Sequence, residues 1–220
     1  LLSSTSGFLY DPEEIKKLVD FAANRKEGPL WLIADEIYLG MHFKECGYLS
    51  QHWEDYPYMI IVGGASKTHH MTGWRLGWAY LPEELASIYF PAHQYITVCA
   101  SVVSQLAFDA VCGTREEADW LEYQRNLYRE KSRMVVEKLS HVRKIIGGDG
   151  AFYALLQLND SDLKQGDDVY WAQTFAREHD VLTIPGSAFG TNTKGYLRLS
   201  FGARKEELEQ GLDQIAAAFS

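Results

Sequence analysis

Apolar positions in the first half of the chain form two kinds of pattern. Between Asp11 and Gly28 they recur on one face at helical spacing, and a proline follows the aspartate, which predicts a capped amphipathic helix. Residues 30–34 and 58–62 are continuously apolar, and 76–81 less cleanly so, which is typical of strands buried on both faces of a sheet. Because helical or connecting segments separate these strands, we expect an α/β layer with a mostly parallel sheet.

The pattern changes near residue 113. A helix is predicted from Pro82 onward, and a second one over 98–112. The residues at 114–117 match a capping box and predict a long, charged, amphipathic helix that continues to about residue 139. We therefore place a domain boundary near 113, with this long helix bridging it.

The remaining residues alternate between strand and helix patterns. This alternation predicts a small α+β domain over 114–220. Its strands are expected at 144–146, 152–158 and 195–201, and its helices at 169–178 and at the end of the chain, where Leu208, Leu212, Ile215 and Phe219 share one face.

Composition argues against several classes of function. The net charge is −9 and no basic stripe offsets it, so binding to nucleic acid or to an anionic membrane is not expected. The three cysteines are widely spaced and odd in number, which suggests reduced thiols in a cytoplasmic protein. The adjacent His69 and His70 point apart in any regular element, so no metal site is predicted. No stretch approaches the roughly 20 apolar residues of a membrane span.

The most informative stretch of the chain surrounds Lys67. It reads Gly-Ala-Ser-Lys-Thr over 64–68, and Gly-Trp-Arg-Leu-Gly follows over 73–77. A lysine that becomes neutral can attack an aldehyde and form an imine with it. Arg75 can hold a phosphate in a two-pronged grip. An aldehyde that carries a phosphate describes pyridoxal 5'-phosphate.

Asp35 is the second candidate for chemistry. It lies just past the expected strand at 30–34, where ligands bind in open α/β sheets. A carboxylate there can pair with a protonated pyridine nitrogen and keep the ring cationic. The alternative is that Asp35 only caps the next segment, as aspartate often does at strand ends. The lysine motif downstream favours the cofactor role.

With Ala-Asp-Glu-Ile-Tyr at 34–38 and Tyr-Leu-Arg-Leu-Ser-Phe at 196–201, these motifs resemble the C-terminal part of a class I/II aminotransferase, a fold type I pyridoxal-phosphate enzyme. The resemblance implies that 1–113 is the C-terminal part of the large cofactor-binding domain and that 114–220 is the small C-terminal domain. Such enzymes are roughly twice as long as this chain.

The resemblance also implies a role for each candidate residue. Lys67 forms the Schiff base and moves a proton between the substrate and the cofactor. Asp35 pairs with the pyridinium nitrogen, and Tyr38 lies near the cofactor's phenolic oxygen. Ser66 and Arg75 bind the phosphate.

The resemblance implies that Arg198 binds the substrate's α-carboxylate. This would give a partner to a guanidinium whose unpaired burial within an apolar strand is costly. Each of these roles has a structural alternative. Tyr38 could simply pack in the core, Arg75 could form a salt bridge with an acid elsewhere, and Arg198 could belong to a buried ion pair.

The chain departs from the family pattern at two cofactor contacts. Ser4 stands where the family usually has an asparagine that hydrogen-bonds the phenolic oxygen, so Ser4 is the candidate for this cofactor contact, although serine is shorter. Gly64 stands where a serine commonly binds the phosphate. The family's glycine-rich phosphate loop and the aromatic ring that stacks on the pyridine precede the part that this chain resembles. We therefore expect these residues to need the missing N-terminal half, in cis or in trans.

The sequence thus predicts a pyridoxal-phosphate-dependent aminotransferase that moves an amino group between an amino acid and a 2-oxo acid. By resemblance, a cytoplasmic homodimer is expected. Two alternatives remain open: a lyase or synthase of the same fold, and a degenerate aminotransferase-like module that binds a partner without catalysis. Only transamination requires a 2-oxo acid acceptor, and only a chain that binds the cofactor through Lys67 gains a visible absorption band.

Overall fold

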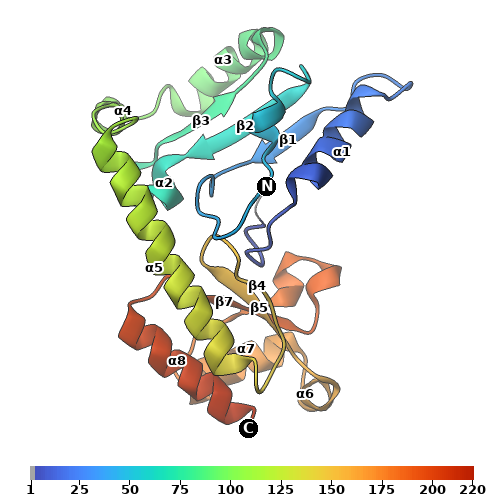
Figure 1. The fold of residues 1–220 in the computed structure, drawn as a ribbon, viewed down its shortest axis with the longest axis vertical. Helices are drawn as coiled ribbons and strands as arrows, with labels where there is room; N and C mark the ends of the chain where they lie inside the picture. The colour runs from blue at the N-terminus through green and yellow to red at the C-terminus, as the bar shows by residue number, and fades with distance from the viewer. Residues whose placement is uncertain (1–2) are drawn as a thin grey trace. The chain divides into compact units, whose positions relative to one another are not determined.

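The computed structural model describes residues 3–220, which form two compact units (Figure 1). The first unit contains Tyr10–Arg125, and the second combines Ser3–Leu9 with Asn126–Ser220. The units divide within the long helix α5, Arg115–Leu139, which contributes residues to both. The domain boundary near residue 113 stays a prediction, because compactness by itself does not fix where a domain ends.

The first unit contains a three-stranded sheet in the order β1-β2-β3. Strands β1 (Leu32–Asp35) and β2 (Met59–Gly64) are parallel, and β3 (Gly77–Tyr80) pairs antiparallel with β2. The α/β class is confirmed, and each strand lies within the predicted apolar run or within two residues of it. The described part of the sheet is mixed, with one parallel and one antiparallel pair.

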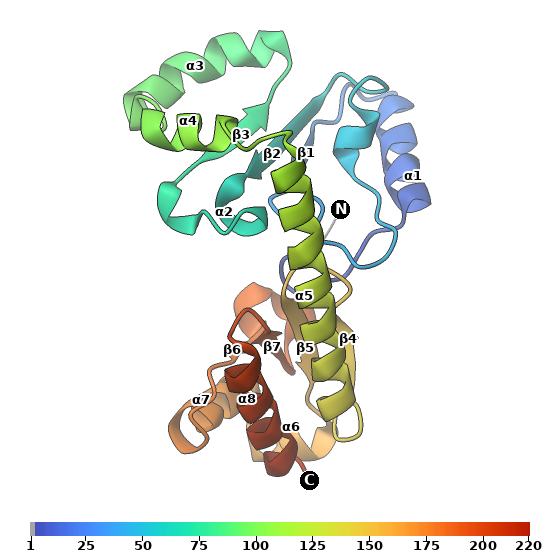
Figure 2. The same cartoon turned by 60° about the vertical axis from the view of Figure 1, so that its left-hand side comes forward.

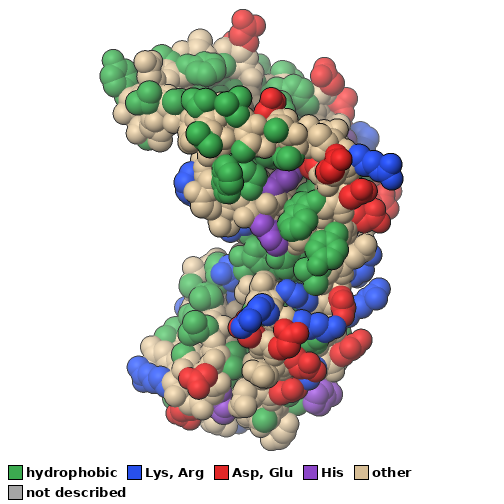
Figure 3. Space-filling model, turned by 90° about the vertical axis from the view of Figure 1, so that its left-hand side faces the viewer, with side chains coloured by type: hydrophobic (Ala, Val, Ile, Leu, Met, Phe, Trp, Pro, Cys, Tyr) green, Lys and Arg blue, Asp and Glu red, His purple; other side chains and the backbone are tan. Residues whose placement is uncertain are grey.

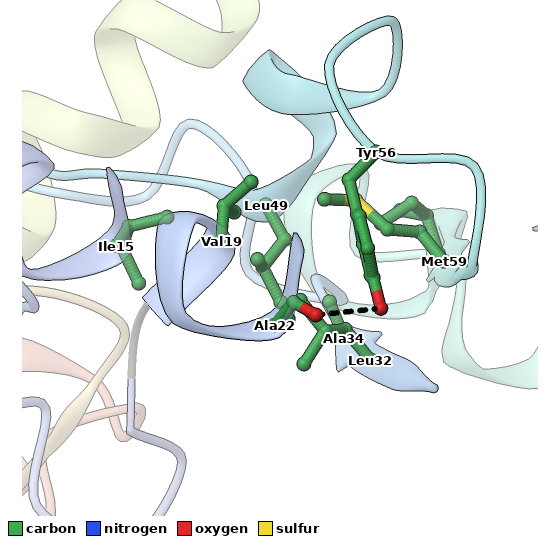
Figure 4. Packing of buried hydrophobic residues seen from close by; sticks show 9 residues of the cluster. Ile15, Val19, Ala22, Leu32, Ala34, Leu49, Tyr56 and Met59 are labelled. Carbon is green, nitrogen blue, oxygen red and sulfur yellow. Dashed lines mark hydrogen bonds between the residues drawn. The ribbon is translucent and has the colours of Figure 1, made fainter. Parts of the chain in front are cut away.

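Helix α1, Pro12–Ala23, packs on one face of this sheet (Figure 4). It begins where the sequence predicts, because Asp11 accepts a hydrogen bond from the Glu13 amide at 2.8 Å and Glu14 reaches back to the Asp11 amide. Burial of apolar side chains holds the layer together. The core comprises Ile15, Val19, Ala22, Leu32, Ala34, Leu49, Tyr56, Met59 and Ile61.

A large apolar surface remains exposed on two other helices of the first unit, α3 (Glu83–Thr97) and α4 (Val102–Asp109). No residue of α3 is buried, and Tyr95 is 93% exposed. Figure 3 shows hydrophobic side chains gathered over these helices. We call this the α3–α4 apolar surface; it comprises Ile88, Phe90, Tyr95, Ile96, Val98, Val102, Val103 and Leu106.

The second of these helices starts later in the chain than predicted. Helix α3 runs through Thr97, and α4 starts at Val102 rather than at 98. Between them Val98 adopts φ 61° and ψ −69°, and the Cys99 amide donates to the Thr97 carbonyl at 2.7 Å. This tight turn and the residues up to Ser101 delay the start of the second helix, which the apolar pattern predicts at 98.

The second unit is a four-stranded antiparallel sheet in the order β4-β5-β7-β6, with helices packed against it (Figure 2). Phe175, Leu197 and Phe201 are fully buried in its core. Ion pairs between Lys138 and Asp213 and between Lys205 and Glu130 connect α5 with α8. The strands are β4 (Ile145–Gly147), β5 (Tyr153–Gln157), β6 (Ile184–Pro185) and β7 (Tyr196–Ser200), and the helices are α6 (Asp160–Gln165), α7 (Asp168–Glu178) and α8 (Lys205–Ala218).

The small α+β arrangement agrees with the predicted fold class. Helix α6 and strand β6 were not predicted, because both are too short to show a periodic pattern. Over residues 3–220, none of the helices combines the length and the apolar character needed to cross a membrane.

Candidate active site

Three of the predicted residues emerge at one edge of the first unit's sheet. Strands β1 and β2 are parallel, so both end at the same edge, where Asp35 pairs with Val62 in register. Asp35 is the last residue of β1, and Lys67 lies in the short helix α2, Ala65–Thr68, directly after β2. Strand β3 runs in the opposite direction and so begins at this edge, where Arg75 lies just before its first residue. Figure 1 shows α2 at the end of β2.

The backbone around Lys67 is tightly packed, and this explains the glycine at position 64. A Cβ atom on Gly64 would lie 2.9 Å from Ile37 Cδ1 and 3.1 Å from the Leu76 carbonyl oxygen. The Ala65 amide donates to that same carbonyl at 3.2 Å. Helix α2 is therefore fixed between the segment that follows β1 and the segment that leads into β3, and Lys67 is partly buried there.

Among residues 3–220, one carboxylate oxygen of Asp35 accepts a hydrogen bond within the chain, and the other does not. Its Oδ1 accepts a hydrogen bond from the Ile37 amide at 3.1 Å, which is the capping role considered as an alternative. No side chain or amide in the described part of the chain is bonded to Oδ2, and the residue is exposed. Capping and a second interaction through Oδ2 are therefore compatible.

The two neighbours of Asp35 at this edge are buried. Tyr38 is only 5% exposed, so its position is compatible both with core packing and with a hydroxyl contact. Glu36 accepts a hydrogen bond from the Ser50 amide at 3.1 Å and is 4% exposed, which indicates a structural role.

Arg75 presents an exposed guanidinium group. The residue has left-handed backbone angles, φ 53° and ψ 47°, and its Nη1 donates to the Thr72 carbonyl at 3.1 Å within the short helix η2, Thr72–Trp74. Within residues 3–220 no carboxylate forms an ion pair with it, so the salt-bridge alternative has no support. Ser66 lies beside Lys67 and is partly buried.

His69 and Glu117 form a pair that sequence reasoning missed. His69 Nε2 lies 2.7 Å from Glu117 Oε1, and its Nδ1 lies 2.8 Å from the Thr68 hydroxyl. The Gly113 amide donates to the other Glu117 oxygen at 2.6 Å. This pair connects the end of α2 with the start of α5. The two residues are far apart in the sequence, so no local pattern could reveal the contact.

A cavity of about 700 Å³ lies on the β2–β3 side of the first unit. Its walls include Trp53, Trp78, Tyr80 and Phe108, together with His69. The volume is typical of small-molecule pockets. Asp35, Lys67 and Arg75 are not among its lining residues, but Glu36, Ile37, Gly64 and Thr68 are, so the cavity adjoins the edge at which the three residues emerge.

The second unit holds the other two predicted residues. Arg198 lies on β7, and its Cζ is 4.3 Å from the ring centroids of both Tyr153 and Phe189. No ion pair to Arg198 occurs in the part of the chain that is described, so the buried ion-pair alternative has no support. Ser4 is exposed in a turn, and its predicted contact with the cofactor stays a prediction.

The two rings around Arg198 were also missed by sequence reasoning. Tyr153 could have been found from strand pairing, since Leu155 is opposite Arg198 and residue 153 is its neighbour on the same face. Phe189 ends the short helix η3, Gly186–Phe189, and no periodic pattern marks it.

The donor set at the sheet edge fits pyridoxal 5'-phosphate. It includes a carboxylate with an open oxygen for a ring nitrogen, an amine on α2 for an aldehyde, and an arginine without an acidic partner for a phosphate. In contrast, no group of three or more metal-binding side chains occurs among residues 3–220, which gives no indication of a metal site.

Comparison with known proteins shows similarity along nearly the whole chain. A probable N-acetyl-LL-diaminopimelate aminotransferase of Bacillus subtilis (strain 168) is 31% identical over 97% of this chain and 52% of its own length. A probable aspartate aminotransferase of Methanocaldococcus jannaschii is 29% identical over 99% of this chain and 56% of its own length. The chain thus spans about half the length of the curated relatives it matches.

Solved structures give the same result for the fold. The aspartate aminotransferase of Thermotoga maritima superposes with a TM-score of 0.84 and 29% identity, over 98% of this chain and 54% of that one. An aromatic aminotransferase from Pyrococcus horikoshii OT3 has a TM-score of 0.90 at 24% identity, over 98% of this chain and 57% of that one, which supports the fold alone. The family described as aminotransferase class I and II matches residues 2–215. The chain therefore belongs to the class I and II aminotransferases.

Proposed function

We propose that this chain provides the lysine-bearing part of a pyridoxal-phosphate-dependent aminotransferase, which moves an amino group between an amino acid and a 2-oxo acid. The observation that carries the proposal is the common sheet edge, where Asp35, Lys67 and Arg75 emerge from three consecutive strands and loops. When bound, pyridoxal phosphate supplies a cationic ring that accepts electrons from the substrate's Cα.

Asp35 and Arg75 would orient the cofactor from opposite ends. The open Oδ2 of Asp35 would accept a hydrogen bond from the protonated ring nitrogen and keep that proton in place. Arg75, with Ser66 beside Lys67, would donate hydrogen bonds to the phosphate oxygens. The hydroxyl of the buried Tyr38 would donate to the phenolic oxygen.

Lys67 would have two tasks at one position. Its Nζ would hold the cofactor covalently at the aldehyde carbon before substrate arrives. As a free amine, Nζ would move a proton at the substrate's Cα. The close packing around Gly64 supports this proposal, because it fixes the backbone that carries the lysine.

Arg198 would bind the substrate's α-carboxylate through paired hydrogen bonds. Its guanidinium has aromatic neighbours and no acidic partner within residues 3–220, so its charge is available to an incoming carboxylate. The amino acid and the 2-oxo acid both carry a carboxylate at this position, so one arginine can bind the substrate in both halves of the reaction.

The activity would further require the part of the fold that the relatives have and this chain lacks. The exposed α3–α4 apolar surface supports this requirement, because soluble monomers seldom expose so many large apolar side chains together. We propose that the missing half is supplied in cis or in trans and that the complete protein is a homodimer.

The direct test is the colour of the purified protein. With added pyridoxal phosphate, the complete polypeptide that carries these residues should gain a visible absorption band, and Lys67→Ala should abolish it. Lys26→Ala, at an exposed lysine remote in sequence, is the matched control and should retain the band. A Lys67→Ala protein with an unchanged band would refute the proposed role of this lysine. Product formation that requires a 2-oxo acid would separate transamination from elimination.

A further inference from the structure

The surroundings of Arg198 differ from those of an ordinary surface arginine. Its guanidinium carbon lies over the ring of Tyr153 and over the ring of Phe189, 4.3 Å from each centroid. The side chain is half-buried, and within residues 3–220 it has no carboxylate partner. Two aromatic contacts therefore replace the ion pair that would normally accompany a partly buried guanidinium.

The first ring is placed by strand pairing. In the antiparallel pair of β5 and β7, Leu155 lies opposite Arg198, and Tyr153 is two residues away along the same face. Diagonal neighbours of this kind are within reach of aromatic and long side chains. The contact therefore follows from the register of the sheet.

The second ring is placed by a rigid loop. The Thr193 hydroxyl donates to the Gly186 carbonyl at 2.7 Å, and Asp168 accepts a hydrogen bond from the Ser187 amide at 2.6 Å. A Cβ on Gly186 would lie only 2.0 Å from the Thr193 carbonyl oxygen, so the loop closes too tightly for any other residue. Phe189 ends this loop and is thereby held against Arg198.

From these contacts we propose that Tyr153 and Phe189 are positioning residues that hold the Arg198 guanidinium so that its N–H groups face an incoming carboxylate. Contact through ring faces uses the π surface of the guanidinium and leaves its in-plane donors for hydrogen bonds. The rings restrict the arginine's rotamers before the ligand arrives, which reduces the entropy lost on binding. A lysine cannot replace it, since an ammonium has no planar fork.

The inference rests on the proposed function of Arg198 and extends it to two residues that need not touch the substrate. The ligand class is a planar carboxylate that approaches in the plane of the guanidinium.

The test combines arginine-labelled NMR with acetate as a minimal carboxylate, in the complete polypeptide. In the unmodified protein, the Arg198 Nε–H resonance should be displaced by the ring currents of its neighbours, and it should shift further as acetate is added. Tyr153→Leu and Phe189→Leu should each reduce the displacement and weaken acetate binding about fivefold. Tyr153→Phe keeps the ring and should bind acetate within twofold of the unmodified protein.

The outcomes test two claims: the positioning role of Tyr153 and Phe189, and the proposed function. Leucine variants that bind acetate as tightly as the unmodified protein would overturn the positioning role. If those variants fail to fold, an Arg198 resonance without ring-current displacement in the unmodified protein would overturn it equally. If acetate still shifts the Arg198 resonance but the protein gains no visible absorption band with pyridoxal phosphate, the positioning role stands and the proposed function is refuted. The two failures can therefore be told apart.

Discussion

At the scale of single residues, the local surroundings decide which side chains are available for chemistry. Asp35 has one oxygen committed to the Ile37 amide and one open, whereas Glu36, next to it, is buried and bonded to the Ser50 amide. Two adjacent carboxylates thus have different roles because alternate residues of the strand end point to opposite faces. Sequence alone pointed to Asp35, since it lies at the position where ligands bind in an open α/β sheet.

Tyr48 gives a prediction for alkaline pH. Burial raises the pKa of its phenol above the ordinary 10.0, and the neighbouring Cys46 raises it further. The folded state therefore favours the protonated phenol. Its contribution to stability is fully present below pH 10 and is lost as pH rises from there toward the higher pKa of the folded state.

We expect Tyr48→Phe to flatten the decline of the free energy of unfolding above pH 10, measured by urea denaturation across a pH series. Tyr95→Phe is the control, because Tyr95 is 93% exposed, and it should leave the decline unchanged. A steeper decline in the Tyr48→Phe protein would contradict this account.

At the scale of elements, regular segments were predictable where the signals are local. Helix α1 begins at the predicted cap, and the capping box before α5 marks its start within one residue. A second helix was predicted from 98, but the tight turn at Val98 was not, because nothing in an apolar run specifies a residue with positive φ. The pairing of His69 with Glu117 joins two elements that only the folded chain brings together.

The junction of β2 and α2 provides the prediction at this scale. Gly64→Ala should lower the free energy of unfolding by about 1–3 kcal/mol, because the added methyl group would press on Ile37 and on the Leu76 carbonyl. Gly73→Ala is a matched control in the nearby helix η2, where an added Cβ meets nothing within 4 Å.

The control should change stability by no more than about 0.5 kcal/mol. Urea denaturation of both variants measures the difference. Equal stabilities of the Gly64→Ala and Gly73→Ala proteins would mean that the packing beneath Lys67 is looser than described.

At the scale of the whole molecule, the chain matches only part of each of these curated relatives. It spans about half the length of its curated relatives, and the α3–α4 apolar surface has no cover within residues 3–220. The family could be predicted from the motifs around Lys67 and Arg198 because their residue types and spacing are specific. The extent of the exposed surface could not be predicted, since it depends on which elements are present to cover it.

The exposed surface predicts how the 220-residue chain behaves alone. In sedimentation velocity it should self-associate in a concentration-dependent manner, because large apolar side chains such as Tyr95 and Val103 would be removed from water. Supplying the N-terminal half of a complete protein should suppress this association. A stable monomer over a wide range of concentrations would contradict the requirement for a second half.

The central claim is that Lys67 binds the cofactor covalently, and trapping that bond tests it most directly. The complete polypeptide would be incubated with pyridoxal phosphate, reduced with borohydride, digested and mapped by mass spectrometry. The account predicts a single reduced adduct on the peptide that contains Lys67. Adducts spread over exposed lysines such as Lys26, with none on Lys67, would contradict it.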